Sequence, residues 1–208
     1  MGRKDVIGAQ RALQRLYLVR HGETAWSLTG QHTGRTDIPL TERGEQDARK
    51  LADRLRAVRF SRVFTSPQQR ARRTCELAGL NTAAEIDPDL AEWDYGDFEG
   101  LRPEDIRKAR PTWNVFRDGC PGGESPAQVS DRADRLVARL RTLEGNVAIF
   151  SHGHFGRVIA ARWIGFQVSH AQHFLLSTAS LGILGYEHNL PDEPAVVLWN
   201  AVSNELLA

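Results

Sequence analysis

Short apolar runs alternate with amphipathic stretches along most of this chain. Residues 16–19 (LYLV), 63–65 (VFT) and 147–150 (VAIF) are runs of mainly aliphatic and aromatic residues. Their length and their β-branched and aromatic content are typical of buried strands. Residues 181–186 and 195–200 form two further runs, which predict a closing hairpin.

Helix signals lie between these runs. Thr41 is a candidate N-cap followed by acidic residues, and apolar positions recur at helical spacing over residues 48–58. Ser66-Pro67 and Ser125-Pro126 each predict a helix start, with Ser as the cap and Pro at the first helical position. The first of these two helices is expected to run to Gly79.

The remaining segments complete an alternation of strands and helices. A polar loop is predicted over residues 22–39, and a later long loop holds a short helix at 103–109. A further helix is expected after the third strand and ends near Gly165. Such alternation predicts a three-layer α/β/α sandwich with a largely parallel central sheet. We expect one domain over residues 15–208, preceded by a loose extension at 1–14.

The composition agrees with a single globular domain. The chain has 208 residues, of which 41% are hydrophobic, enough for one sizeable core. A net charge of +1 favours neither nucleic acid nor membrane, so we expect neither as a partner, and no oligomeric state is indicated. No apolar stretch approaches the roughly 20 residues that span a bilayer, and the polar start lacks a signal-peptide core. These features predict a cytoplasmic protein.

Neither the two cysteines nor the closely spaced histidines of the chain match a known metal-binding or redox motif. Cys75 and Cys120 form no C-x-x-C motif. One disulfide between them is an option, although two isolated thiols more often stay free in a reducing compartment. His152 and His154 lie close together, but no third ligand follows at a recognisable spacing. We therefore predict neither a metal nor a cofactor.

Side chains suited to phosphate follow the first three strands. Arg20 and His21 end the first, Arg70 follows the second, and His152 follows the third. Ligands of open α/β sheets bind beyond the carboxyl ends of the strands. If these strands are neighbours, two Arg and two His meet there, and the planar guanidinium suits phosphate. The pattern predicts an enzyme that acts on phosphate esters.

Four ordered motifs resemble those of one enzyme family. They are LVRHGET at residues 18–24, SPQQRA at 66–71, EWDYGDFEG at 92–100 and SHG at 151–153. Together they resemble the histidine phosphatase superfamily, also called phosphoglycerate mutase-like, over roughly residues 15 to 165. The resemblance implies a phosphoglycerate mutase-like fold and catalysis through a phosphohistidine.

The resemblance also implies a role for each catalytic residue. His21 matches the nucleophile, which divides one displacement into two easier steps. Arg20, Arg70 and His152 match the groups that bind the phosphoryl oxygens. Glu92 matches the general acid that protonates the departing oxygen and later activates water. Glu99 is the alternative carboxylate for this role.

Three functions are compatible with this chemistry. The first is a phosphomonoester hydrolase, the second a cofactor-dependent phosphoglycerate mutase, and the third a phosphoresidue-binding module without catalysis. The mutases cover their site with long basic segments, and they usually have Asn where this chain has Ser27 and His154. A binding module is expected to lack the nucleophile or the acid, and both are present here. These features favour the hydrolase.

The segments around the first motif indicate the substrate class. Residues 23–27, 30–34 and 36–41 look most like a branch with sugar-bisphosphate phosphatases and broad acid phosphatases. We therefore expect a small phosphorylated metabolite as substrate, such as a sugar phosphate or sugar bisphosphate. The residues expected to bind it are Ser27, Thr33, Gly34 and His154. Four aromatic residues are candidates for the pocket wall: His32, Trp93, Tyr95 and Trp113.

Overall fold

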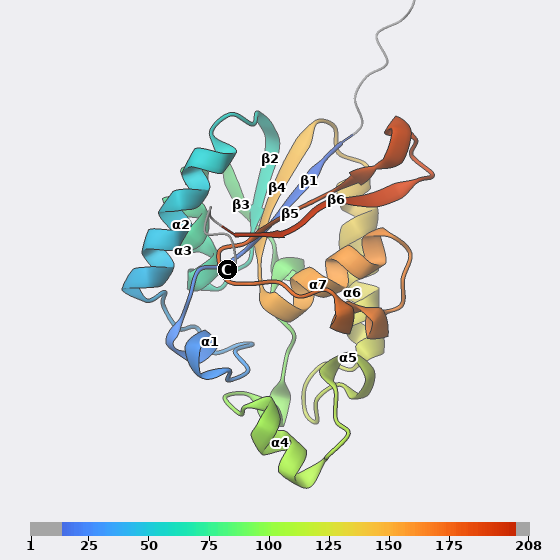
Figure 1. The fold of residues 1–208 in the computed structure, drawn as a ribbon. Helices are drawn as coiled ribbons and strands as arrows, with labels where there is room; N and C mark the ends of the chain where they lie inside the picture. The colour runs from blue at the N-terminus through green and yellow to red at the C-terminus, as the bar shows by residue number, and fades with distance from the viewer. Residues whose placement is uncertain (1–13, 203–208) are drawn as a thin grey trace, which may run out of the picture.

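A computed structural model describes residues 14–202, which form one six-stranded sheet with the strand order β3-β2-β4-β1-β5-β6 (Figure 1). The strands are β1 (Leu16–Arg20), β2 (Phe60–Thr65), β3 (Ala84–Ile86), β4 (Asn146–Ser151), β5 (Leu181–Tyr186) and β6 (Pro194–Ala201). Strands β1 to β4 pair in parallel, whereas β5 and β6 join antiparallel. The predicted hairpin and the largely parallel sheet are confirmed.

Helices cover both faces of the sheet (Figure 1). The long ones are α2 (Glu42–Leu55), α3 (Gln69–Leu77), α6 (Pro126–Arg141) and α7 (Gly153–Trp163). Figure 1 shows α2 and α3 on one side and α6 and α7 on the other. Three short helices lie beyond the carboxyl ends of the strands: α1 (Ala25–Thr29), α4 (Pro103–Ala109) and α5 (Val115–Asp118). The predicted three-layer sandwich is therefore confirmed.

Strand β1 shows how alternation divides the core into two layers. Leu16 and Leu18 belong to the larger apolar cluster, which includes side chains of α6 and α7. Tyr17 and Val19 belong to a second cluster that includes side chains of α2 and α3. Successive side chains of a strand point to opposite faces, so an uninterrupted apolar run is buried on both sides.

The sheet order brings the three phosphate motifs together. Strand β4 lies between β1 and β2, with Arg20 level with Ser151 and Thr65 level with Phe150. Parallel strands end at the same edge of a sheet, so the residues after all three strands share one place. The expectation that these strands are neighbours is confirmed.

Two glycines meet where the loop after β1 crosses the start of α2. A Cβ on Gly22 would lie 2.4 Å from the carbonyl oxygen of Gly44. A Cβ on Gly44 would lie 2.2 Å from the carbonyl oxygen of Glu23. No side chain fits at either position, so the loop packs directly on the first turn of α2. The Gly22 amide also donates to Thr74 Oγ1 of α3 at 2.9 Å.

Helix starts match the sequence predictions in two places and differ in one. Thr41 caps α2, and Ser125 forms a capping box with Gln128 at the start of α6. The predicted cap at Ser66 is wrong, because α3 begins at Gln69 and Gln68 occupies the N-cap position. The hydroxyl of Ser66 instead lies 2.6 Å from Nε2 of His152, which follows the neighbouring strand β4. A tertiary contact thus replaces the local cap.

Some short elements lie inside predicted loops. Helix α1 falls in the loop expected over residues 22–39, and β3 and α5 fall in the later long loop. Helix α1 has five residues, none of them buried, so no apolar periodicity marks it. Five further 3-10 segments are Asn81–Ala83, Pro88–Leu90, Gly96–Phe98, Val168–His173 and Glu187–Asn189.

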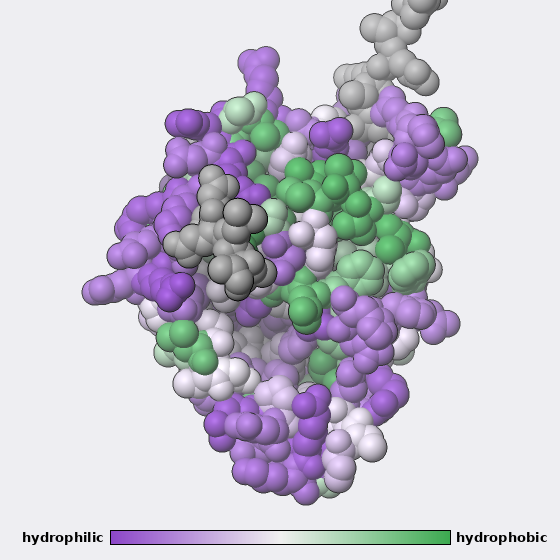
Figure 2. All heavy atoms as spheres, viewed as in Figure 1, coloured by the Kyte–Doolittle hydropathy of each residue, from purple (hydrophilic) through white to green (hydrophobic). Residues whose placement is uncertain are grey.

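The surface is hollowed between α1 and α7, and hydrophobic side chains gather over β6 (Figure 2). Within residues 14–202, no helix has the length and apolar content needed to cross a membrane. Cys75 and Cys120 are both free and buried. The expected extension lies outside the described residues except for Gln14, whose amide donates to the carbonyl of Leu140 at 2.8 Å.

Candidate active site

A cavity of about 170 Å³ opens at the carboxyl ends of β1 and β4. Six residues predicted from the sequence line it: Arg20, His21, Ser27, Thr33, Glu92 and His154. Among the predicted site residues, Arg70, His152 and Gly34 lie behind this wall instead. The six lining residues come from segments far apart in the sequence, and the sheet order brings them together.

The hydrogen bond made by the His21 ring leaves one nitrogen free. Its Nδ1 donates to the carbonyl oxygen of Gly22 at 2.7 Å. A carbonyl only accepts, so the proton of the neutral ring is on Nδ1 and Nε2 carries a lone pair. Burial and the nearby Arg70 and Arg20 hold the pKa of His21 well below 6.5. The ring is therefore a neutral nucleophile beside two guanidinium groups.

Arg20 lines the cavity, and one of its donors has no partner among the described residues. Its Nη1 donates to the carbonyl of Leu176. Its Nε is buried and has no hydrogen-bond partner among the described residues. An unpaired buried donor is costly unless a ligand accepts from it. Arg20 is thus suited to bind an anion next to His21.

Arg70 is completely buried and holds a loop of the site. Its guanidinium donates to the carbonyl oxygens of Thr33 at 2.9 Å, Gly34 at 3.0 Å and Thr36 at 2.9 Å. Its Nε donates to Nδ1 of His152 at 3.2 Å. These bonds fix the segment that presents Thr33 to the cavity.

His152 stands behind the nucleophile. Its ring centre is 5.2 Å from that of His21. Because Nδ1 accepts from Arg70, the proton of the neutral ring is on Nε2, which lies 2.6 Å from Ser66 Oγ. Burial and Arg70 hold the pKa of His152 well below 6.5. In this arrangement both of its nitrogens bind protein groups.

The Glu92 carboxylate is fixed by backbone amides. It accepts from the amide N–H groups of Trp93 at 2.9 Å, Phe155 at 2.7 Å and His154 at 3.0 Å. Two of these donors lie in the first turn of α7, where the helix dipole favours negative charge. The side chain is only 8% exposed and faces the cavity.

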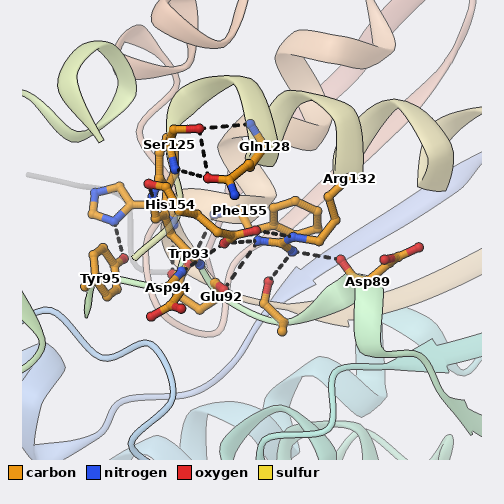
Figure 3. A network of polar contacts seen from close by, with 12 residues as sticks. Asp89, Glu92, Trp93, Asp94, Tyr95, Ser125, Gln128, Arg132, His154 and Phe155 are labelled. Atoms are coloured by element: carbon orange, nitrogen blue, oxygen red, sulfur yellow. Dashed lines mark hydrogen bonds and ion pairs between the residues drawn. The ribbon is translucent and has the colours of Figure 1, made fainter. Parts of the chain in front are cut away.

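Arg132, which was not predicted from the sequence, holds the backbone that leads into Glu92 (Figure 3). Arg132 of α6 donates to the carbonyl oxygens of Asp89 at 2.9 Å and Ala91 at 2.8 Å. It also forms a two-pronged ion pair with Glu124, at 2.8 and 2.7 Å. The backbone leading into Glu92 is thereby tied to α6. The only sequence signal for this contact is the position of Glu124 just before a helix.

The alternative carboxylate, Glu99, lies in a different place. It accepts from the amides of Gly34, at 2.9 and 3.0 Å, and Thr36, at 3.0 Å. Glu99 therefore holds the same loop that Arg70 holds, and it does not line the cavity. Gly34 contributes only its backbone to these contacts.

The rings of His32, Tyr95 and His154 also line the cavity. His32 stacks on Tyr95 with ring centres 4.5 Å apart, and the Tyr95 hydroxyl lies 2.5 Å from His154 Nδ1. Burial lowers the pKa of His32 to about 4, and its buried Nε2 has no partner among the described residues. Of the four aromatic residues predicted for the pocket wall, His32 and Tyr95 line this cavity, whereas Trp93 and Trp113 do not. Arg157 also lines the cavity and was not predicted from the sequence.

A second hollow on the described part of the chain contains none of the residues of this cavity. A larger hollow of about 520 Å³ lies beside α2 and α3 and contains none of the predicted site residues. Among residues 14–202, no three His, Cys, Asp or Glu side chains are grouped as metal ligands.

Comparisons with known proteins identify the family. The sequence profile of the histidine phosphatase superfamily (branch 1) matches residues 16–202. An acid phosphatase of Mycobacterium tuberculosis is 45% identical, covering 85% of this chain and 88% of that protein. A sedoheptulose 1,7-bisphosphatase of Saccharomyces cerevisiae is 34% identical, covering 88% and 92%.

The fold agrees with that assignment. The solved structure of an open reading frame product of Mycobacterium tuberculosis superposes with a TM-score of 0.86 and 40% identity, covering 91% of this chain and 98% of that one. The family profile spans residues 16–202, which include all six strands and the four motifs. The chain therefore belongs to the histidine phosphatase superfamily and is a phosphatase of its branch 1.

Proposed function

We propose that this enzyme hydrolyses phosphomonoesters of small metabolites through a phosphohistidine on His21. A sugar phosphate or sugar bisphosphate is the proposed substrate, in keeping with the relative that acts on sedoheptulose 1,7-bisphosphate. The observation that carries the proposal is that His21, whose Nε2 carries a lone pair, lines the same cavity as Arg20, whose Nε has no partner among the described residues. A nucleophile and a guanidinium group thus line the same space.

The first half-reaction transfers the phosphoryl group to the protein. The Nε2 lone pair of His21 attacks phosphorus, and the bond from phosphorus to the ester oxygen breaks. Arg20 donates to the phosphoryl oxygens, where charge is spread in the transition state. Glu92 gives a proton to the departing oxygen, so the product leaves as an alcohol.

The second half-reaction regenerates the enzyme. The Glu92 carboxylate takes a proton from water, and the resulting hydroxide attacks the phosphohistidine. The bond between phosphorus and Nε2 breaks, which releases inorganic phosphate and restores the His21 lone pair. Each half-reaction uses Glu92 once, so its protonation state is restored after a full cycle.

The hydrolase is favoured over the mutase by the surroundings of the cavity. A mutase must return the phosphoryl group to a second hydroxyl and exclude water. The segments that border this cavity, 30–34 and 101–107, include exposed side chains such as Leu101 and Arg107.

We also place the enzyme in the cytoplasm, where two free buried thiols stay reduced.

A trapping experiment tests the proposal. Brief reaction with ³²P-labelled p-nitrophenyl phosphate, followed by denaturation, is expected to leave an acid-labile, base-stable label on His21. His21→Ala is expected to lose both the label and turnover, whereas His170→Ala, a histidine outside the cavity, retains them. A stable label on Ser or Cys, or full turnover in His21→Ala, contradicts the mechanism.

A further inference from the structure

Arg132 and Glu124 form a largely buried ion pair next to the segment that carries Glu92. Arg132 is only 9% exposed, and its Nε and Nη2 donate to the two carboxylate oxygens of Glu124 at 2.8 and 2.7 Å. Neither residue lines the catalytic cavity. The attraction within a buried ion pair is largely offset by the desolvation of both charges, so such a pair adds little net stability. The groups that the pair orients are therefore its more informative feature.

We propose that the Arg132–Glu124 pair positions the Glu92 carboxyl group for proton transfer to the leaving oxygen. Arg132 is a positioning residue, because it lies outside the cavity and acts through Glu92. This inference rests on the proposed phosphomonoesterase function and on Glu92 as its general acid. It adds the requirement that protonation of the leaving group depends on a charge pair that does not line the cavity.

Side chains bind every carbonyl oxygen of the segment from Asp89 to Glu92. Arg132 Nη1 donates to the carbonyl oxygens of Asp89 at 2.9 Å and Ala91 at 2.8 Å, and its Nη2 donates to that of Glu92 at 3.4 Å. The remaining carbonyl of the segment accepts from Ser151 Oγ, at the end of β4, at 2.8 Å. The backbone that carries Glu92 is thus fixed mainly by one guanidinium group (Figure 3).

Arg132 also contacts the helix end that binds the Glu92 carboxylate. The Cζ atom of Arg132 lies over the Phe155 ring, 3.8 Å from its centre. A guanidinium over the face of an aromatic ring is attracted by the negative charge of that face. The backbone N–H of Phe155, in the first turn of α7, donates to Glu92 Oε1 at 2.7 Å. Arg132 therefore holds both the backbone that carries the carboxylate and a residue that donates to it.

Glu124 orients Arg132 and connects it to the residues that follow Glu92. Its Oε2 accepts from the amide of Asp94 at 2.9 Å, and its carbonyl oxygen accepts from Trp93 Nε1 at 2.9 Å. Its own amide donates to the carbonyl oxygen of Asp94 at 2.9 Å. A two-pronged ion pair fixes the plane of a guanidinium group. The contacts before and after Glu92 are therefore joined through this one pair.

The acid is expected to be more sensitive to this pair than the nucleophile is. A general acid must lie within hydrogen-bond reach of the oxygen that it protonates, and a misplacement of about 1 Å can cost about 10²-fold in rate. His21 and Arg20 are held by other segments, through the carbonyl oxygens of Gly22 and Leu176. Loss of the pair is therefore expected to impair proton transfer more than attack on phosphorus.

The test uses aryl phosphates that differ in leaving-group basicity and little in size: 4-nitrophenyl, phenyl and 4-methoxyphenyl phosphate. The readout is the slope of log kcat/KM against the pKa of the leaving phenol, which steepens when the proton is delivered less effectively. A variant that is only less stable, or that binds phosphate less well, loses rate on all three esters and keeps the slope. Arg132→Gln is expected to steepen it, with a loss of about 10- to 100-fold on phenyl phosphate and less than about threefold on 4-nitrophenyl phosphate.

A second variant and a matched control separate positioning from folding. Glu124→Gln leaves the bonds from Arg132 to the carbonyl oxygens in place, so it is expected to fold, and it is expected to steepen the slope by a smaller amount. Arg162 forms a comparable two-pronged ion pair with Asp134, at 2.7 and 2.9 Å, which joins α7 to α6. Arg162→Gln is therefore the control, and its slope is expected to equal that of wild type.

A double variant tests whether Arg132 acts through Glu92. In Glu92→Gln the proton donor is already absent, so the slope is at its steepest. Adding Arg132→Gln to Glu92→Gln is then expected to leave the slope unchanged, whereas independent effects add.

The outcomes distinguish this inference from the proposed function. A wild-type slope in folded Arg132→Gln or in Glu124→Gln, while Glu92→Gln steepens it, overturns the positioning role alone. Additive slopes in the double variant also overturn it. A wild-type slope in Glu92→Gln overturns the assignment of the acid together with this inference. A wild type that hydrolyses none of the three esters overturns the proposed function as well.

Discussion

The Nε–H of Arg70 donates to Nδ1 of His152 across 3.2 Å. This contact fixes the His152 tautomer, because an arginine can only donate and Nδ1 must accept. The remaining ring proton then points to Ser66 Oγ at 2.6 Å. The side chains of Arg70, His152 and Ser66 thus form a chain of contacts that joins the carboxyl ends of β2 and β4 next to His21.

Replacing Arg70 is expected to affect stability as well as catalysis. In Arg70→Gln, three carbonyl oxygens and His152 Nδ1 lose their donors, and each unsatisfied buried group costs about 1–3 kcal/mol. We expect the free energy of unfolding to fall by about 3 kcal/mol or more, measured by urea denaturation. Arg72→Gln, an exposed neighbour on α3, is expected to change it by less than about 0.5 kcal/mol. Equal stability of the two variants contradicts the structural role.

The two candidate carboxylates are expected to differ in their leaving-group dependence. In Glu92→Gln, hydrolysis of alkyl phosphates is expected to fall about 10²–10⁴-fold, the typical contribution of general acid–base catalysis. The pre-steady-state burst with p-nitrophenyl phosphate is expected to fall much less, because p-nitrophenolate leaves without a proton.

Glu99→Gln serves as the matched comparison. Its carboxylate holds the amides of Gly34 and Thr36, so its loss displaces a loop rather than removing a proton donor. We expect both substrate classes to be affected to a similar extent. A leaving-group dependence in Glu99→Gln but not in Glu92→Gln reverses the assignment.

Buried His32 is expected to make stability pH-dependent. Its pKa falls from 6.5 to about 4 on folding because of burial, so the unfolded chain binds a proton before the folded one does. The contribution to stability is complete above pH 6.5 and is lost as the pH falls toward 4. Between pH 7 and pH 5 this residue is expected to account for about 2 kcal/mol.

His32→Phe retains a ring that can stack on Tyr95 and removes the titration. Urea unfolding of both proteins at pH 7 and pH 5 measures the difference. The wild type is expected to lose more stability than the variant over this range. The same loss in both excludes His32 as the source of the pH dependence.

Activity is expected to persist in excess chelator. Arg20 beside His21 supplies positive charge of the kind that Mg²⁺ supplies in other phosphoryl-transfer enzymes. Turnover of p-nitrophenyl phosphate is therefore expected to be unchanged after incubation with EDTA and gel filtration. Loss of turnover that a defined divalent ion restores contradicts the prediction.

The sequence predicted the elements whose signals are local and strong. The runs that became β1 and β4 are buried on both faces, and Ser125 and Thr41 are caps with acceptors in their own first turn. The same reasoning failed at Ser66, because the competing partner, His152, is 86 residues away in the sequence. N-cap preferences consider only residues close in sequence, so they could not anticipate the contact between Ser66 and His152.

The site was predicted in part for a similar reason. Arg20 ends strand β1 and His21 follows it, so their place at its carboxyl end follows from the strand prediction. Arg157 and Arg132 lie on helices among many other arginines, and nothing in their sequence neighbourhood distinguishes them from surface charges. Their roles arise from carbonyl oxygens of distant segments, which only the folded chain brings near.

The contact between Gly22 and Gly44 explains one letter of the first motif. Neither glycine touches the cavity, yet each would drive a Cβ into a backbone oxygen if it were replaced. The glycine that follows His21 is therefore required by helix α2 and not by phosphate. Replacing Gly22 while keeping His21 would therefore retain the nucleophile but disturb the packing of its loop on α2.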